Sequence, residues 1–406
     1  MKAVELFAGA GGLALGVGLA GFKPVAVVEW DKWACDTIRQ NQAKAYPLVS
    51  DWPLYEGDVR SFDWKGISGE IDLLAGGPPC QPFSIGGKHR AHDDDRDMFP
   101  ATVEIVRKLC PRAFIIENVK GLTRSNFANY FQYIQLQLEF PEVNCRRTEG
   151  WFDHFQRLQA EHTSGRLHRT GLAYNVVPTL VNAANYGVPQ KRQRVFLVGL
   201  RSDLGVSWSF PTQTHSELAL FRDQWVTGEY WNRHSIARKH RPQPPINLDK
   251  KVKNLRQCLL FDELRPWRTI RDALVGLPDP RSVAAKSYSD HVFQAGARVY
   301  PGHTGSPLDL PSKTLKAGDH GVPGGENMLV ETNGDPRYLS VREAARVQTF
   351  PDGYAFHGSW SEAMRQLGNA VPVALGHVVA RSVAESLLIK DSADVLQHRV
   401  KIKGVA

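Results

Sequence analysis

The sequence predicts an α/β protein with a doubly wound, mostly parallel sheet and a smaller, irregular second domain. In the first part of the chain, short apolar runs typical of buried strands alternate with helix-like stretches. This alternation is typical of a parallel sheet with helices on both faces. Beyond residue 200 the alternation stops. We expect strands at residues 3–7, 24–29, 71–75, 113–117, 173–181 and 195–200, and helices at 13–20, 32–42, 101–109 and 128–138.

Composition and charge narrow the class of protein. The chain has 406 residues, of which 42% are hydrophobic and 23% charged, as in ordinary soluble globular proteins. Its net charge of +8 is compatible with a polyanionic partner. The five cysteines form no Cys-x-x-Cys pair, so we expect neither a zinc site nor a disulfide framework, and a reducing cytoplasm fits. Glu5 and six glycines interrupt the apolar residues 3–22, which argues against a signal peptide or a membrane span.

A glycine turn connects the first expected strand to the first expected helix. Glycines at such a turn let the backbone approach a ligand closely, and the helix N-terminus offers amide donors. The turn therefore indicates a cofactor site, with a tight turn that binds no ligand as the alternative. It consists of Phe7, Ala8, Gly9, Ala10, Gly11 and Gly12.

Two carboxylates follow at the ends of the next expected strands. Glu29 lies twenty residues after Gly9, where a carboxylate can hold two ribose hydroxyl groups. Trp30 beside it offers a flat face for an adenine ring. Asp58, followed by Val59, closes a third expected strand and can accept a hydrogen bond from the adenine amino group. The pattern indicates a nucleoside cofactor without specifying which one.

A cysteine lies on a loop directly after the expected strand at 71–75. The loop reads Gly-Gly-Pro-Pro-Cys-Gln-Pro-Phe-Ser over residues 76–84, and its glycines and prolines stop both helix and strand. Ligands bind at the strand ends of open α/β sheets, which makes Cys80 a candidate nucleophile. A small core residue is the alternative for a single cysteine.

Charged side chains border two later strands. Glu117 ends an apolar strand, where desolvation favours the protonated carboxyl group and lets it donate to a ring nitrogen. A helix-capping or lysine-paired glutamate is the alternative. Arg192 and Arg194 precede the strand at 195–200 and lie on the same side by strand alternation. Two aligned guanidinium groups can bind phosphate or hold a carboxylate and a carbonyl oxygen, with a solvated basic strand start as the alternative.

In this order, these motifs resemble those of the DNA (cytosine-5) methyltransferases, in particular the modification enzymes of prokaryotic restriction-modification systems. The resemblance covers roughly residues 1–200 and 311–385. It implies the Rossmann-like fold of S-adenosylmethionine-dependent methyltransferases and methylation of cytosine carbon-5 in a specific duplex DNA sequence. Methylation of cytosine in transfer RNA is the alternative. The motifs are the glycine turn, Pro-Pro-Cys-Gln at 78–81, Glu-Asn-Val at 117–119, Gln-x-Arg-x-Arg at 190–194, the block at 339–351 and Gly-Asn-Ala-Val-Pro at 368–372.

The resemblance also implies a role for each candidate residue. The Cys80 thiolate attacks carbon-6 of a flipped-out cytosine, and Glu117, as a neutral acid, donates to ring nitrogen 3. Arg194 holds the exocyclic oxygen, and Arg192 steadies the acid and a nearby phosphate. S-adenosylmethionine is the implied methyl donor, and no metal is expected. Its expected contacts are Phe7, Ala8, Gly9, Gly11, Gly12, Glu29, Trp30, Asp58, Val59, Pro79, Asn369 and Val371.

The resemblance divides the chain into functional segments. The lid over the flipped base is expected at 84–98, and 141–172 is expected to be a surface insertion rather than a DNA contact. Arg342, Glu343 and Arg346 are expected to brace the recognition domain. The segments are a catalytic and cofactor-binding domain at 1–200, a target recognition domain at 201–335, a hinge at 336–363, a C-terminal helix that returns to the catalytic domain at 364–390, and a frayed tail at 391–406.

The recognition domain is expected to bind duplex DNA. Eight Lys and Arg residues against one Asp lie between Trp231 and Arg256. Together with Trp225, Trp231 and Trp267 they suggest a surface that follows phosphates and reads base edges, with a solvated face as the alternative. We expect a monomer in the prokaryotic cytoplasm, associated with the nucleoid and not with a membrane, and a cognate restriction endonuclease as genetic partner.

Two other classes of protein share part of this pattern. A nicotinamide- or flavin-dependent oxidoreductase has the glycine turn and the acid after the second strand, but it does not explain the remaining motifs. A DNA-binding relative without catalytic activity predicts loss of Cys80 or Glu117, and both residues are present. The methyltransferase interpretation therefore accounts for more of the sequence than either class.

Overall fold

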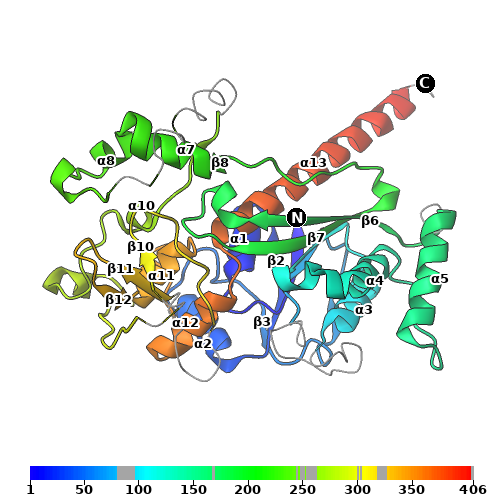
Figure 1. Ribbon diagram of the computed structural model, residues 1–406. Helices are drawn as coiled ribbons and strands as arrows, with labels where there is room; N and C mark the ends of the chain where they lie inside the picture. The colour runs from blue at the N-terminus through cyan, green and yellow to red at the C-terminus, as the bar shows by residue number, and fades with distance from the viewer. Residues whose placement is uncertain are drawn as a thin grey trace. The chain divides into compact units, whose positions relative to one another are not determined.

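The computed structural model describes two compact units (Figure 1). The described residues are 1–79, 97–166, 170–243, 246, 252, 263–299, 301, 304–317 and 327–403, apart from the side chains of 394 and 396–403. The first unit comprises Met1–Val181, Gln193–Pro211 and Gly376–Ala406, and the second comprises Asn182–Arg192 and Thr212–Leu375. Each unit is therefore assembled from segments that lie far apart in the sequence.

Among the described residues, the first unit is built on a seven-stranded sheet with the order β3-β2-β1-β4-β5-β7-β6. β7 runs antiparallel to β5, whereas β1 to β5 pair in parallel. The predicted doubly wound, mostly parallel sheet is therefore confirmed. Its strands read as apolar runs because a parallel sheet is covered on both faces. They are β1 Lys2–Leu6, β2 Lys23–Glu29, β3 Leu54–Glu56, β4 Leu73–Gly76, β5 Ala113–Val119, β6 Tyr174–Asn182 and β7 Gln193–Arg201.

Helices cover both faces of this sheet. Val4 and Leu6 of β1 pack in one cluster with buried side chains such as Phe99 and Ile134 of the following helices. The buried side chains of α1, α2 and α13 do not belong to that cluster and cover the opposite face. The helices are α1 Gly12–Leu19, α2 Lys32–Ala43, α3 Phe99–Leu109, α4 Ala128–Glu139, α5 Trp151–Ser164 and α13 Val373–Lys403.

The C-terminal helix α13 is longer than the sequence predicted. We expected a helix over 372–389 and a frayed tail from 391, but α13 continues to Lys403 (Figure 1). The prediction of a frayed tail was wrong at its first residue, Asp391, where a tertiary contact holds the helix beyond its apolar stripe. The Arg112 guanidinium donates to Asp72 Oδ1 at 2.9 Å and to Asp391 Oδ2 at 3.2 Å. The segment Trp360–Ala393 is long and apolar enough to cross a membrane by composition, but half of that apolar window is buried, as in core helices of soluble proteins.

Replacing Asp391 with asparagine should destabilise the last turns of α13. The side chain is 46% exposed, so we expect a loss of only about 1 kcal/mol, with faster amide hydrogen exchange beyond Asp391. Arg381→Ala is the matched control, because Arg381 forms an ion pair with Glu385 on the same helix and both side chains are more than half exposed. Equal hydrogen exchange in the two variants would show that Arg112 does not anchor the helix.

The segment 141–172 adds helix α5, which was not predicted. Its His154 is 2% exposed and places Nδ1 at 2.8 Å from the Tyr133 hydroxyl of α4, and Nε2 at 2.7 Å from the carbonyl of Val143. Phe155 and Leu158 join the same core cluster as β1. The segment therefore extends the core of the first unit, and its expected role as an insertion without DNA contact stays a prediction.

The second unit consists of short elements, in agreement with the predicted irregular domain. Its described strands form a three-stranded sheet, β10-β11-β12, and a two-stranded sheet, β8-β9. The strands are β8 His215–Ser216, β9 Arg265–Pro266, β10 Ser306–Pro307, β11 Met328–Val330 and β12 Pro336–Tyr338. The helices are α7 Glu217–Arg222, α8 Glu229–Arg233, α10 Ile270–Leu274, α11 Val341–Val347 and α12 Trp360–Asn369.

Two of the tryptophans that we expected on a DNA-reading surface are core residues instead. Trp231 and Trp267 are 2% and 7% exposed and pack with Tyr230 and Leu220. Trp231 Nε1 donates to the carbonyl of Gln224 at 2.5 Å, so its polar edge is satisfied inside the unit. The prediction was wrong for these two residues because a large apolar side chain near basic residues can also pack in the core, where the aliphatic parts of the basic side chains cover it.

The buried charges of α11 brace the second unit from within. The Arg342 side chain is fully buried and donates to the carbonyls of Ser289 and Tyr354 at 3.0 and 2.7 Å. Glu343 accepts from both terminal nitrogens of Arg337, at 2.6 and 2.7 Å. All of these partners belong to the second unit. The contacts agree with the predicted bracing role for Arg342 and Glu343.

Candidate active site

The glycine turn has the backbone geometry that close approach by a ligand requires. Gly9 and Gly11 have φ angles of 54° and 85°, in the left-handed region that favours glycine. Gly11 is the N-cap of α1, and its N–H group donates to the carbonyl of Ala8 at 2.9 Å. Phe7 also has a positive φ angle of 53°, an unusual value for a bulky residue and one associated with functional turns.

Glu29 holds this turn from the end of β2. Its Oε2 accepts from the Gly9 N–H at 2.6 Å, and its Oε1 accepts from the N–H groups of Trp30 and Asp31 at 2.9 and 2.7 Å. Burial raises the pKa of Glu29, and the hydrogen bonds from Asp31, Gly9 and Trp30 oppose that effect. Trp30 is 66% exposed, so its ring is free of the core and available for stacking.

Asp58 has a partner that sequence reasoning missed. Arg60 donates to both of its oxygens, from Nε to Oδ1 at 3.0 Å and from Nη2 to Oδ2 at 2.6 Å. This side-chain hydrogen bonding lowers the pKa of Asp58. The Val59 side chain belongs to the core of the first unit, and its carbonyl accepts from Trp64 Nε1 at 2.9 Å. The expected cofactor contacts of Asp58 and Val59 stay predictions.

Glu117 and Arg194 form a largely buried ion pair between β5 and β7. Arg194 Nε lies 2.8 Å from Glu117 Oε1, and the two side chains are 12% and 9% exposed. The antiparallel register opposes Arg194 to Val119, which brings both charged side chains to the same end of the sheet. Burial lowers the pKa of the Arg194 guanidinium, and the charge of Glu117 opposes that shift. Sequence reasoning predicted both residues but not their pairing.

The stretch from Gly77 to Pro79 passes directly beside this ion pair. A Cβ atom on Gly77 would lie 3.2 Å from Glu117 Oε2, so the glycine backbone packs against the carboxyl group. The carbonyl of Pro79 accepts from the N–H group of Met98 at 3.3 Å. Cys80 and most of the expected lid at 84–98 lie outside the described residues.

Arg192 belongs to the second unit, where it binds backbone carbonyls. Its side chain is 0% exposed, and Nη1 and Nη2 donate to the carbonyls of Leu315 and Gly368 at 3.1 and 2.7 Å. Gln348, which the sequence analysis did not single out, donates from Nε2 to the carbonyls of Leu367 and Ala370. These contacts fix the backbone around Gly368, which precedes the expected cofactor residues. The expected catalytic role of Arg192 stays a prediction, as do the cofactor contacts of exposed Asn369 and buried Val371.

The chain is similar to known cytosine methylases over nearly its whole length. The family model for C-5 cytosine-specific DNA methylase matches residues 1–142 and 153–385. The chain is 31% identical over 388 residues to the Type II methyltransferase M.NgoMIV of Neisseria gonorrhoeae, covering 95% of this chain and 97% of that relative. It is 30% identical over 395 residues to the Type II methyltransferase M.PspPI of Psychrobacter sp. (strain TA137), covering 95% and 79%.

Solved structures share the fold. The S. pombe Dnmt2 methyltransferase superposes with a TM-score of 0.53 at 16% identity, covering 95% of this chain and 98% of that one. A prophage-encoded protein of E. coli superposes with a TM-score of 0.58 at 21% identity, covering 95% and 99%. The first unit therefore has the Rossmann-like methyltransferase fold that the resemblance implied.

The fold and the sequence matches define a methyltransferase. The chain belongs to the C-5 cytosine-specific DNA methylases, and it is a DNA (cytosine-5) methyltransferase of the restriction-modification type. The family match omits residues 143–152, which comprise most of the connection between α4 and α5 and the first two residues of α5, in the segment expected to be an insertion.

Proposed function

We propose that this enzyme transfers a methyl group from S-adenosylmethionine to carbon-5 of a cytosine flipped out of duplex DNA, with Cys80 as the nucleophile. The observation that carries the proposal is the position of Glu117. One oxygen pairs with buried Arg194 at 2.8 Å, and the other faces Gly77, three residues before Cys80. An acid is thus held beside the backbone that leads to a thiol.

This arrangement suits the activation of cytosine. Carbon-5 is a weak nucleophile, and a bond between the Cys80 thiolate and carbon-6 moves electron density onto it. In its protonated form, Glu117 donates a hydrogen bond to ring nitrogen 3 and stabilises the charge that this attack creates. Methyl transfer is followed by loss of the carbon-5 proton, which breaks the bond to Cys80 and releases the product.

The two arginines differ in the roles that their contacts support. Arg194 touches Glu117 and orients the acid, the role that the sequence analysis gave to Arg192. It also remains the candidate for holding the exocyclic oxygen of the base. Arg192, buried among the carbonyls of Leu315 and Gly368, supports the backbone of the second unit. We therefore assign Arg194 to the reaction and Arg192 to positioning.

The first unit offers a fitting site for the methyl donor. S-adenosylmethionine supplies the methyl group from a positively charged sulfonium. The Glu29 carboxylate accepts three backbone hydrogen bonds, and since a carboxylate offers about four acceptor positions, capacity for a ribose hydroxyl group remains. Trp30 is exposed, and its ring is available to stack on an adenine. The glycines with positive φ angles let a ligand approach the turn closely.

The relatives are named Type II methyltransferases, which supports a role in restriction-modification. We propose that the enzyme works as a monomer in the prokaryotic cytoplasm, near the nucleoid, and protects host DNA from a cognate restriction endonuclease.

Because the target carbon is stacked inside the duplex, the cytosine must leave the helix to reach Cys80, at a cost of about a few kcal/mol.

The test is transfer of labelled methyl groups from S-adenosylmethionine to mixed-sequence duplex DNA, with Cys80→Ser in parallel and transfer RNA as second substrate. We expect label in 5-methylcytosine of the DNA with the wild-type enzyme alone. Label in another base, or equal labelling by the Cys80→Ser variant, would overturn the proposed mechanism. Label in transfer RNA but not in DNA would favour the alternative substrate.

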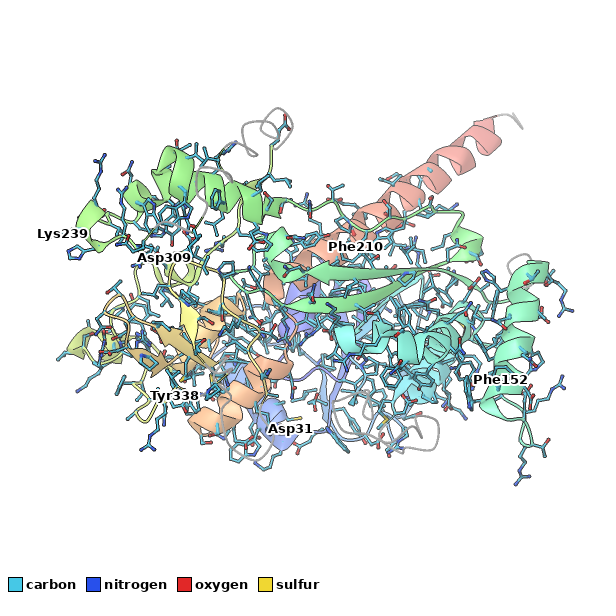
Figure 2. The ribbon with its side chains drawn as sticks, in the orientation of Figure 1. Asp31, Phe152, Phe210, Lys239, Asp309 and Tyr338 are labelled. Carbon is cyan, nitrogen blue, oxygen red and sulfur yellow. The ribbon has the colours of Figure 1, made fainter. Side chains whose placement is uncertain are left out.

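Removing two exposed cations of the second unit should weaken DNA binding in a salt-dependent way. Arg238 and Lys239 are exposed, and Figure 2 shows Lys239 pointing away from the rest of the unit. Each cation that contacts a phosphate contributes about 0.9 to the magnitude of the slope of log K against log salt concentration. The magnitude of this slope should therefore be smaller by up to about 2 in the double alanine variant. Lys44→Ala, at an exposed position of the first unit, is the control. An unchanged slope would exclude both residues from the interface.

A further inference from the structure

The loop between α4 and α5 carries two exposed arginines. Neither Arg146 nor Arg147 forms a side-chain ion pair with another residue that the structure describes. The carboxylate of Glu149 in the same loop is already neutralised, because Arg157 of α5 donates from Nε to Oε1 at 2.9 Å and from Nη2 to Oε2 at 2.6 Å. Two positive charges therefore remain at the surface of this loop.

Hydrogen bonds hold the loop in a fixed turn. The Arg146 N–H donates to Glu149 Oε2 at 2.8 Å, and the Glu149 N–H donates to the carbonyl of Arg146 at 3.0 Å. The Arg157 guanidinium also donates to the carbonyl of Asn144 at 2.7 Å. Arg147 lies at the tip of the turn, between these anchored residues. Since the backbone is already ordered, less conformational entropy is lost when the arginines bind a ligand.

Aromatic contacts connect the start of α5 to α4. The Trp151 ring lies 5.9 Å from the Tyr133 ring, and the Tyr133 ring lies 6.3 Å from the Tyr130 ring. The Tyr130 hydroxyl donates to the carboxylate of Asp97, two residues before α3 begins. The start of α5 is therefore two aromatic rings away from Asp97.

Asp97 lies at the carboxyl end of the sheet. The next N–H group, that of Met98, donates at 3.3 Å to the carbonyl of Pro79, three residues beyond the end of β4. Figure 2 shows Phe152 of α5 and Asp31, which follows β2, both low in the first unit. Ligands of open α/β sheets bind at the carboxyl ends of the strands. The loop and the start of α5 thus lie on the side of the first unit that receives the substrate.

An exposed aromatic side chain follows the two arginines at the start of α5. Phe152 is 49% exposed, although rings of this size are usually buried. The neighbouring Asp153 lies in the first turn of α5, where Oδ2 is 3.5 Å from the position of a Cβ atom on Gly150, and the helix dipole offsets its charge. Positive charge beside a flat apolar ring suits nucleic acid, a polyanion whose bases and sugars offer apolar faces.

We propose that residues 143–152 form an additional DNA-binding surface, in which Arg146 and Arg147 contact phosphates of duplex DNA that flanks the target site. This inference rests on the proposed action on duplex DNA. It departs from the expectation that the segment makes no DNA contact, and these residues lie outside the family match. Because phosphate contacts carry no base information, the surface adds affinity and not sequence specificity.

The layers of the first unit indicate which part of the DNA the surface reaches. α5 packs outside α4, and α4 packs outside the sheet that carries Glu117. Two such layers amount to about 20 Å, the length of about six base pairs. A duplex that ends closer to the target cytosine therefore lacks the phosphates that Arg146 and Arg147 contact.

The test measures Kd for two duplexes that contain the sequence found to be methylated in mixed-sequence DNA, with about 3 or about 15 flanking base pairs on each side, between about 50 and 200 mM salt. The variant is Arg146→Ala/Arg147→Ala. On the long duplex, its Kd at the lower salt concentration should be about tenfold higher than that of the wild type. The magnitude of the slope of log K against log salt concentration should be smaller by up to about 2. On the short duplex, the variant and the wild type should agree.

The matched control is Lys23→Ala/Lys44→Ala, which removes the same charge at the opposite end of the sheet. Lys23 begins β2 and Lys44 follows α2, and both are exposed. All three proteins should have the same thermal midpoint, because the substituted side chains are at the surface. If the arginine variant matched the lysine control on the long duplex, the inference would be wrong. An equal loss of affinity on both duplexes would also overturn it, since the arginines would then act within the target site.

Failure of the proposed function would look different. Wild-type enzyme that neither binds nor methylates duplex DNA would overturn the proposed function, and this inference with it. Wild-type enzyme that methylates DNA but binds both duplexes with the same affinity and salt dependence would overturn this inference alone. Tighter binding of the long duplex that depends on Arg146 and Arg147 would support both.

Discussion

Glu117→Gln should lower kcat for DNA methylation by about 10²- to 10⁴-fold, the usual contribution of a positioned general acid. Glutamine keeps the shape of the side chain but cannot transfer a proton to ring nitrogen 3. It also removes the charge that Arg194 faces at 2.8 Å. The measurement is kcat with saturating DNA and S-adenosylmethionine, together with KM for each substrate.

Loss of stability must be separated from loss of catalysis in this variant. An arginine left buried without its carboxylate costs about 3–5 kcal/mol, so rates should be compared below the lower of the two thermal midpoints. Asp72→Asn is the control, because it removes a carboxylate from another partly buried ion pair of the first unit, with Arg112 at 2.9 Å. This control variant should lower the thermal midpoint and leave kcat unchanged. A kcat for Glu117→Gln equal to that of this control would contradict the assignment of the acid.

Glu5→Gln should make the protein more stable at neutral and alkaline pH. Glu5 is 1% exposed in β1, and its Oε1 has no hydrogen-bond partner among the described residues. Burial raises the pKa of Glu5 from 4.5 to about 8. Between these values the folded protein holds a proton that the unfolded chain releases, so stability is full below the lower pKa and is lost as pH rises toward the higher one. The loss is about 1.4 kcal/mol per pH unit, on the order of 5 kcal/mol in total.

The measurement is the free energy of unfolding in urea at several pH values across that interval, for the wild type and for Glu5→Gln. As pH rises, the free energy of unfolding should fall less in the variant than in the wild type. The difference between the two slopes should correspond to one proton. Some dependence should remain, because burial also raises the pKa of Glu29, which is unchanged in the variant. Parallel stability curves for the two proteins would show that Glu5 does not hold a proton in the folded state.

The local signals in the sequence were sufficient for most of the first unit. Each expected strand corresponds to an observed one, since parallel strands covered on both faces read as apolar runs with few alternatives. The turn from Phe7 to Gly12 was predictable because its glycines are needed for positive φ angles. Helix α5 was missed because its buried residues His154, Phe155 and Leu158 form a short, partly polar pattern.

Apolar and basic residues of the second unit were harder to assign. Trp231 and Trp267 lie in a region of high positive charge, and composition alone does not show whether an aromatic ring faces the core or a ligand. Asp391, in the part of α13 that was not predicted, pairs with Arg112, which is more than two hundred residues away in the sequence. Contacts of such separation leave no periodic signal near the residues that they stabilise.

By itself, the sequence determined the α/β class, the cofactor turn, the candidate nucleophile and the family, because each depends on residue types at short spacing along the chain. Only the tertiary structure decided which charged groups meet. It paired Glu117 with Arg194 through the antiparallel register of β5 and β7, buried Arg192 among carbonyls, and joined Asn118 to Pro78. The physical reason is that a strand's partner and register depend on the packing of the whole sheet, so contacts across strands follow from the fold and not from local sequence.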